Sequence, residues 1–222
     1  QGASQKKAYA RAEVILSAGA IGSPHLLQLS GIGPAQHLQA HGVEVLQHNS
    51  EIGANLQDHL QLRCSWRLKG VKTLNTLVNS FFGKAKIAAE YLLKRSGPMS
   101  MAPSQLGAFA KSRPNLATAD LEYHVQPLSL NAFGEPLDDY PAITASVCHL
   151  RPESRGEVRL ASSNPLDAPI ISPNFLSTEG DRVVAKDAIN LTRKIMAQPA
   201  LHQYEPKEQK PGQQAQTDHE LM

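Results

Sequence analysis

Cysteine, aromatic residues and net charge are all scarce in this chain. Among 222 residues there are two cysteines, 5% aromatic residues and a formal net charge of +2 at pH 7. Two cysteines cannot build the disulfide framework of a small secreted domain, and both Cys64 and Cys148 lie in apolar, strand-like contexts, so we expect free thiols. A near-neutral chain without a basic stripe and interleaved aromatics also argues against a nucleic-acid partner.

Long apolar runs are absent as well. No stretch approaches the about 20 apolar residues that a membrane-spanning helix requires. Apolar residues nevertheless make up 41% of the chain and charged residues 19%, which is typical of a soluble globular protein. A chain of this length can bury about 70% of its unfolded surface, enough for one sizeable core or two modest ones.

The most informative stretch is rich in small residues and runs to Gly33. It begins with Glu13–Ser17, which predicts a buried strand. Ser23 and Pro24 then combine a preferred N-cap with a proline at a tolerated position, which predicts a helix over residues 24–29. A second short helix should begin at Pro34 and end before residue 42.

Small residues at the end of this strand leave the backbone unshielded, so that a ligand could reach free N–H groups at the helix N-terminus. These residues are Ala18, Gly19, Ala20 and Gly22. The same residues are equally consistent with tight packing of one backbone against another. A phosphate-binding turn in a nucleotide-binding protein is a further reading of residues 19–33.

The order of residues in this stretch resembles the second signature of the glucose-methanol-choline (GMC) oxidoreductases, flavoproteins that oxidise alcohols. The matching positions are Gly19-Ala20, Ser23-Pro24, Leu26-Leu27 and Ser30-Gly31-Ile32-Gly33. Further matches are Pro34, Leu38, Gly42-Val43-Glu44-Val45, Ile52-Gly53-Ala54-Asn55-Leu56-Gln57-Asp58-His59, residues 150–160 and residues 169–176. The resemblance therefore covers almost the whole chain and favours the branch of choline and alcohol dehydrogenases.

The resemblance implies that the cofactor is FAD and that the substrate is a small alcohol. The residues it places near the cofactor are Ala18, Gly19, Ala20, Ser23, Asn55, Asp58 and His59. A structural alternative for the last three is a loop clamp between two domains. Glu51 stands where the family usually has glycine, which puts the path of this loop in doubt.

Two parts of the family pattern do not occur in these 222 residues. The Gly-x-Gly-x-x-Gly loop that holds the flavin pyrophosphate is absent. The catalytic histidine of relatives follows the region where this chain ends, so we assign no catalytic residue, and His219 does not take that role. We expect an internal piece of a longer enzyme, with FAD bound by the parent protein and not by this chain alone.

The expected fold is α+β, with a mainly antiparallel sheet flanked by helices and a partial α/β flavin-domain segment at the N-terminus. Alternation predicts strands over residues 62–68, 105–110, 121–126, 143–149 and 157–161. Helical spacing predicts helices over residues 77–93 and 179–197, the first against one face of the sheet, and the polar chain beyond Pro199 should be loose. We expect a flavin-domain segment at 1–60, a substrate-binding sheet at 61–161 and a return segment at 162–222.

The predicted sheet could form one wall of a substrate pocket. Glu122, His124 and Gln126 alternate along one strand and should point to one face, although a histidine on a strand is more often structural. Met99 and Met101 could line the pocket or fill the core behind a helix end. His37, His41 and His48 have no acidic or cysteine partner at a convincing spacing, so we predict no metal site.

Two functions from different classes remain open. The chain is the substrate-binding portion of an FAD-dependent oxidoreductase that converts a primary alcohol or choline to an aldehyde, or a non-catalytic binding module derived from the same fold. Expected partners are the alcohol and the remaining parts of the parent chain, with self-association through the unpaired strand near Val14. The expected location is cytoplasmic, or peripheral at the inner membrane in the parent.

Overall fold

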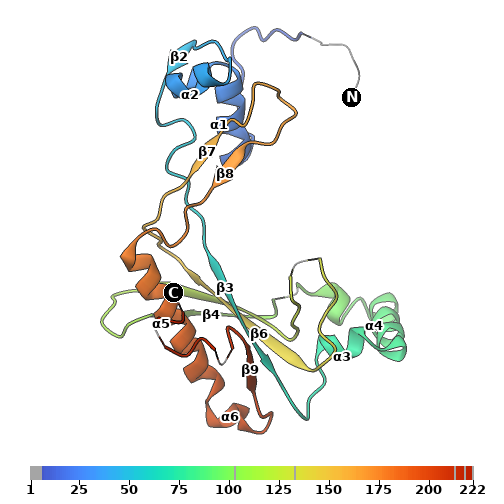
Figure 1. Cartoon of the computed structure of the whole chain (residues 1–222). Helices are drawn as coiled ribbons and strands as arrows, with labels where there is room; N and C mark the ends of the chain where they lie inside the picture. Colours follow the sequence, from blue (N-terminus) through green and yellow to red (C-terminus); the bar gives the residue numbers. More distant parts are fainter. Residues whose placement is uncertain (1–6, 103, 133, 213, 218, 222) are drawn as a thin grey trace. The chain divides into compact units, whose positions relative to one another are not determined.

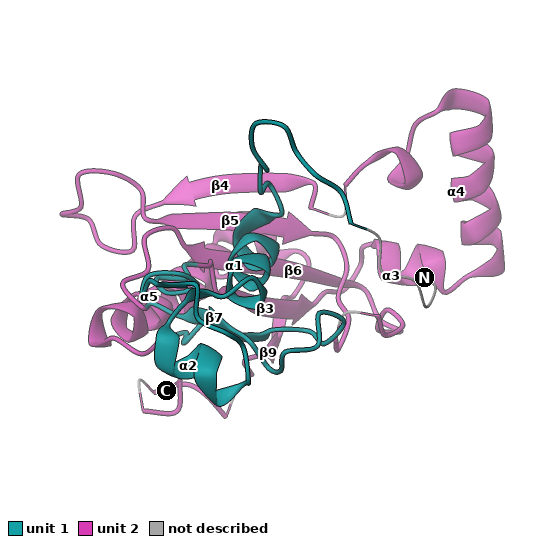
Figure 2. Ribbon diagram, turned by 90° about the horizontal axis from the view of Figure 1, so that it is seen from above, with its two compact units in different colours: residues 1–57, 155–175 teal, residues 58–154, 176–222 magenta. Residues whose placement is uncertain are grey.

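The computed structural model describes residues 7–102, 104–132, 134–212, 214–217 and 219–221. Its contacts divide the chain into two compact units (Figures 1 and 2). Unit 1 comprises the chain up to Gln57 together with Arg155–Phe175, and unit 2 comprises Asp58–Ser154 together with the chain from Leu176 onward. Each unit combines two segments of the chain, whereas we expected three continuous domains. The difference arises because the hairpin of residues 157–172 contacts the N-terminal part of the chain.

Unit 1 consists of short elements. They are α1 (Gly19–Leu29), β1 (Ile32–Gly33), α2 (Ala35–Ala40), β2 (Gln47–His48), β7 (Glu157–Arg159) and β8 (Ile170–Ser172). β1 pairs with β2 in parallel, and β7 pairs with β8 antiparallel. The wholly buried Gln28 ties α1 to β7, since its Nε2 donates to the Val158 carbonyl at 2.9 Å and its Oε1 accepts from the Leu160 N–H at 3.2 Å.

The predicted strand at residues 13–17 is wrong. The segment forms no ladder with any described residue, and Val14 and Ile15 are 78% and 76% exposed. A strand requires a partner for its N–H and C=O groups, and apolar character alone does not supply one. Pairing of this segment with a second copy of the chain stays a prediction.

Helix α1 begins five residues before the predicted start. Gly19 has a φ of 76°, a conformation that glycine adopts readily, and it turns the chain into the helix there. Ser23 is therefore not the N-cap; its Oγ accepts the Ala18 N–H at 3.0 Å, and Pro24 lies inside the helix. The second predicted helix is confirmed as α2.

Unit 2 is built on one antiparallel sheet with the strand order β4-β5-β6-β3-β9. The strands are β3 (Gln61–Arg67), β4 (Leu106–Ala110), β5 (Leu121–Gln126), β6 (Ala142–His149) and β9 (Lys207–Lys210). The helices are α3 (Leu74–Val78), α4 (Phe81–Lys94), η1 (Pro98–Ser100), α5 (Glu179–Met196) and α6 (Pro199–His202). The first four strands match the predicted ones to within one residue, and the expected α+β class is confirmed.

The core of unit 2 lies between one face of this sheet and α5 (Figure 1). The sheet supplies Cys64, Trp66, Leu121, Tyr123, Ala145 and Val147, and the helix supplies Ala188, Ile189 and Met196. Tyr123 also reaches Thr192 on α5, with the two oxygens 3.0 Å apart. Because side chains alternate along a strand, the opposite face of the sheet carries the polar residues.

The helix predicted over residues 77–93 is interrupted. α3 ends at Val78, and Ser80 caps α4 by accepting the Gly83 N–H at 3.4 Å. None of the residues of α4 is buried, so the helix that covers the sheet is α5 and not this one. Among the described residues no helix is both long and apolar enough to cross a membrane.

The expectation of a loose chain beyond Pro199 is also wrong for most of that segment. β9 pairs with β3, and the guanidinium of Arg193 binds both carboxylate oxygens of Glu208 at 3.0 and 3.1 Å. The side chains of this pair are only 17% and 14% exposed, and Arg193 also donates to the Ala215 carbonyl at 2.6 Å. A bidentate, partly buried ion pair thus orders a segment whose composition is typical of disorder.

Both cysteines are buried free thiols on opposite faces of the sheet. Burial raises the pKa of Cys64 to about 12, so almost no thiolate forms at neutral pH. We expect neither thiol to react with Ellman's reagent at pH 8 in the folded protein, and both to react in guanidinium chloride. Rapid reaction of Cys64 under native conditions would contradict the buried position.

Candidate functional site

Unit 1 contains a cavity of about 300 Å³ next to the first turn of α1. Its walls are Ala20, Pro24, Gly53, Ala54, Asn55, Leu56, Gln57 and Val158. Two of the predicted cofactor residues, Ala20 and Asn55, therefore meet there from segments that are far apart in sequence. Gly19 immediately precedes this wall, and Ala18 and Ser23 form the turn that begins the helix.

The segment Gly53–Gln57 forms this wall because it runs close beside the β7 strand. Val158 donates its N–H to the Gly53 carbonyl at 2.6 Å, and Leu56 exchanges backbone hydrogen bonds with Gly156 at 2.9 and 2.8 Å. A Cβ at Gly53, where φ is 80°, would lie 2.1 Å from the Val158 carbonyl oxygen. Only glycine fits at this position, and the exposed Asn55 follows it with a φ of 60°.

The cavity borders a helix N-terminus, which favours an anionic ligand. A Cβ added at Gly19 would meet nothing within 4 Å, so the backbone at the start of α1 is open to a ligand. The first N–H groups of a helix lack intrahelical partners and carry partial positive charge. Small-molecule sites have volumes of about 300 to 1,000 Å³, so this cavity lies at the lower end of that range.

Asp58 and His59 belong to unit 2 and do not line this cavity. Asp58 Oδ1 accepts the His59 N–H at 2.9 Å, and His59 Nε2 lies 3.1 Å from the Leu150 carbonyl. Both side chains are exposed. These contacts support a structural role in the loop, and contact of either residue with a cofactor stays a prediction.

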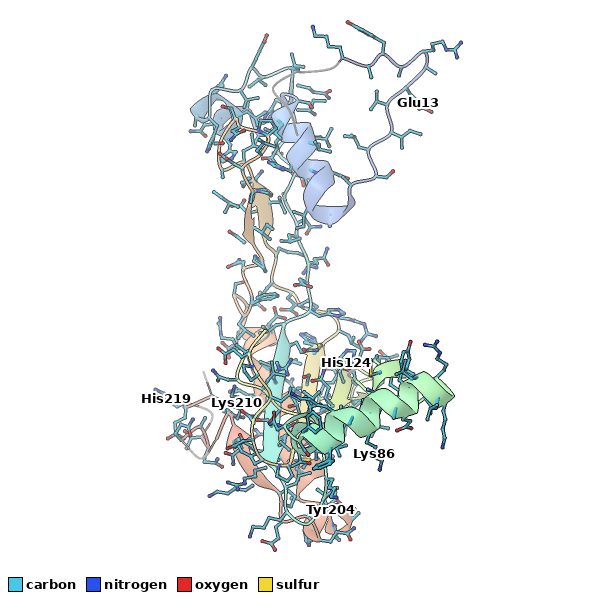
Figure 3. The ribbon with its side chains drawn as sticks, turned by 90° about the vertical axis from the view of Figure 1, so that its right-hand side faces the viewer. Glu13, Lys86, His124, Tyr204, Lys210 and His219 are labelled. Carbon is cyan, nitrogen blue, oxygen red and sulfur yellow. The ribbon has the colours of Figure 1, made fainter. Side chains whose placement is uncertain are left out.

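The polar face of the sheet in unit 2 carries His124 and Gln126, as the alternation along β5 predicted, and Figure 3 labels His124 there. His124 Nε2 lies 3.6 Å from Glu122 Oε1. Gln126 Nε2 donates to Ser104 Oγ at 3.1 Å, and its Oε1 lies 3.5 Å from an Arg63 nitrogen. A surface with both donors and acceptors can orient a hydroxyl group.

Two residues of this face, Arg63 and Ser146, were not predicted from the sequence. Ser146 lies opposite both Arg63 on β3 and His124 on β5, so the three side chains share the face. Ser146 Oγ is buried without a hydrogen-bond partner among the described residues. The alternation of Gln61, Arg63 and Ser65 with Leu62 and Cys64 was the signal that could have placed Arg63 here.

The two methionines proposed as pocket or core residues lie on the surface of unit 2. Met99 is part of η1 and Met101 follows it, and their exposed fractions are 57% and 52%. The core-filling alternative is therefore wrong, because a core residue would be buried. Contact of these side chains with a substrate stays a prediction.

His37 in α2 and His41, which directly follows the helix, both lie against backbone carbonyls. His37 Nε2 lies 3.1 Å from the Leu160 carbonyl, and His41 Nδ1 lies 2.8 Å from the His37 carbonyl. Across the described part of the chain, no three His, Cys, Asp or Glu side chains gather closely enough to hold a metal ion. Hydrogen bonding within unit 1 accounts for these two histidines.

The pKa of His37 lies below its usual value, chiefly because burial disfavours the charged ring and secondly because His41 lies beside it. The two ring centroids are 4.3 Å apart. We expect NMR titration to give His37 a pKa below 6.5, and replacement of His41 by Gln to move it upward. An unchanged His37 titration in His41→Gln would contradict the contribution of the neighbouring ring.

Comparison with known proteins gives the same family at both ends of the chain. The profile of the N-terminal domain of GMC oxidoreductases matches residues 1–61, and that of the C-terminal domain matches residues 152–222. The oxygen-dependent choline dehydrogenase of Vibrio vulnificus is 40% identical over 213 residues, which are 96% of this chain and 38% of that protein. The enzyme of the same name from Pectobacterium carotovorum is 38% identical over 221 residues, which are 39% of that protein. The chain thus spans less than two fifths of these relatives.

Solved structures show the same fold. A formate oxidase superposes with a TM-score of 0.83 at 23% identity, over 96% of this chain and 42% of that one. Pyridoxine 4-oxidase from Mesorbium loti superposes with a TM-score of 0.73 at 25% identity, over 92% of this chain and 36% of that one. Both likenesses extend over nearly all of the chain.

Proposed function

Because this chain belongs to the GMC oxidoreductase family, we propose that it forms part of an FAD-dependent enzyme that oxidises a CH–OH group, with a primary alcohol or choline as substrate. The observation that carries the proposal is the cavity where Ala20 and Asn55 converge. Both residues lie in segments that resemble flavin-binding segments of the family. The names of the relatives from Vibrio and Pectobacterium support the substrate class.

The two units have different tasks in this proposal. Unit 1 binds one portion of the cofactor with the open backbone at Gly19 and Ala20 and with the side chain of Asn55. The polar face of unit 2 holds the substrate, with His124 and Gln126 as hydrogen-bond partners of the hydroxyl. FAD, when bound, would supply the electron chemistry as the acceptor of a hydride from the substrate carbon.

No catalytic base is assigned within this chain. The residues of unit 2 orient the alcohol and exclude water, and the apolar surfaces of Met99 and Met101 complete the lining. We therefore propose that the chain alone is inactive. The alternative, a binding module without catalysis, predicts a ligand for the polar face of unit 2 in the absence of flavin.

Flavin titration tests whether the chain alone has an incomplete flavin site. Added to the chain of 222 residues, FAD should show no stoichiometric quenching of its fluorescence, because these residues do not contain the Gly-x-Gly-x-x-Gly loop that holds the flavin pyrophosphate. One tightly bound FAD per chain would contradict the proposed incomplete site.

A chimera with a complete relative tests whether the cavity of unit 1 contributes to flavin binding. The matching region of the Vibrio enzyme is replaced by residues 1–222, and flavin content and choline oxidation are measured. We expect bound FAD in the chimera and a lower flavin content in its Asn55→Ala variant, whereas Asn164→Ala, at an exposed loop position of unit 1, should retain it. A folded chimera without flavin, or equal flavin content in both variants, would contradict the role of the cavity.

A further inference from the structure

Helix α4 presents an apolar face to solvent. Phe81, Phe82, Leu92 and Leu93 are 81%, 83%, 69% and 83% exposed. With Ala85 and Ala89 they fall within one side of the helix, since residues three or four positions apart share a face. Figures 1 and 3 show α4 extending away from the sheet of its own unit.

The opposite side of α4 is the one that packs. Gly83, Ile87 and Tyr91 are half-buried, and a Cβ at Gly83 would lie 2.1 Å from the Leu77 carbonyl oxygen. The close approach of Gly83 to α3 fixes the rotation of α4 about its axis. The contact between Gly83 and α3 therefore turns the apolar side of α4 toward solvent.

Lys84 and Lys86 border this apolar side, whereas Lys94, seven residues after Ile87, lies at the helix end in line with the packed side. Lys84, Lys86 and Lys94 are all exposed, and within the described residues none of them takes part in an ion pair. The only acidic residue of the helix, Glu90, accepts a hydrogen bond from Ser96 at 3.3 Å, beyond the helix end. Exposed phenylalanine and leucine flanked by lysine are typical of helices that lie in the interface of an anionic bilayer.

We propose that α4 docks the protein on an anionic lipid surface, with Phe81, Phe82, Leu92 and Leu93 inserted among the acyl chains and with Lys84 and Lys86 at the headgroups. A helix of 14 residues is about 21 Å long, too short to span a bilayer, so it lies in the plane of the membrane. A symmetric contact between two copies would bring the same lysines together, and charge favours the lipid over a second copy.

Vesicle sedimentation with the chain of 222 residues tests this proposal. We expect binding to vesicles of phosphatidylcholine and phosphatidylglycerol, and much weaker binding to phosphatidylcholine alone. Lys86→Gln should lower the partition coefficient for the anionic vesicles about five-fold, the effect of one cation near such a surface. High salt should weaken binding in the same direction.

Two double variants show whether binding depends on α4 or on any exposed apolar segment. Phe82→Ser with Leu93→Ser should reduce sedimentation at least ten-fold, while Val14→Ser with Ile15→Ser, in the exposed segment of unit 1, should leave it unchanged. Near-UV circular dichroism verifies that each variant is folded. Absence of binding, or equal binding by both double variants, would overturn the proposal. A dimer in lipid-free solution that Phe82→Ser with Leu93→Ser abolishes would assign the face to a second copy instead.

Discussion

Replacing Asp181 by Ala should lower the free energy of unfolding of unit 2 by about 3–5 kcal/mol. The side chain is 4% exposed and accepts the N–H groups of Glu153 and Ser154, both at 2.8 Å, together with the Ser154 hydroxyl. Alanine would leave these buried donors without acceptors. Denaturant unfolding followed by the fluorescence of Trp66, the single tryptophan and a member of the unit 2 core, measures the change.

Asp187 on the same helix is the matched control. It pairs with Arg113 at 2.9 Å, but the two side chains are 32% and 49% exposed. An exposed ion pair contributes at most about 1 kcal/mol, so Asp187→Ala should have a small effect. Similar losses in the two variants would contradict the importance of burial at Asp181.

The Asp181 carboxyl also makes the stability depend on pH. Burial opposes its ionisation, but the hydrogen bonds from Ser154, Glu153 and Thr178 outweigh this effect and lower its pKa. Its contribution is complete above the unfolded pKa of about 3.9 and is lost as the pH falls through the lower folded value. The stability difference between wild type and Asp181→Asn should therefore begin to shrink as the pH falls below about 4 and should vanish below the folded pKa.

Replacing Gln28 by Ala should destabilise unit 1 by about 2–5 kcal/mol, because the change removes two hydrogen bonds and leaves a cavity. The two backbone partners, the Val158 carbonyl and the Leu160 N–H, lie in buried residues. Hydrogen exchange of the Leu160 amide reports the effect locally, and it should become much faster in the variant.

Two further variants test whether the hydrogen bonds of Gln28 stabilise unit 1. Gln28→Glu preserves the shape but cannot donate to the Val158 carbonyl when ionised, so it should destabilise at least as much as Ala. Gln39→Ala, at an exposed position of α2, should change stability by less than about 0.5 kcal/mol. Unaltered exchange at Leu160 in both Gln28 variants would show that this side chain does not hold α1 to β7.

The sequence predicted best those elements whose pattern is enforced by one buried face. β3, β5 and β6 alternate clearly because one side of each packs on α5 and the other does not. Short strands such as β1 and β9 were missed, since two to four residues carry too little periodicity and their pairing depends on distant partners. Residues 13–17 had the composition of a strand, but composition does not supply a partner.

The candidate site could be predicted where the family pattern fixes residue types at fixed spacing, as at Ala20 and Asn55. The backbone conformation that brings them together depends on Gly53 and on β7, more than 100 residues later, and no local pattern contains that contact. Arg63 and Ser146 were missed because the paired strands β3 and β6 lie far apart in sequence. Their common face becomes apparent only from the register of β3, β5 and β6.

The order in which the chain is synthesised has a consequence for how the two units form. α1 emerges first, but the β7–β8 hairpin that Gln28 binds emerges more than 100 residues later, after most of the sheet of unit 2. α5, which covers that sheet, follows only after the hairpin. Neither unit can therefore mature before the other is largely translated. An expression clone that isolates either unit must join two separate stretches of the gene, because each unit combines two segments that a segment of the other unit separates in sequence.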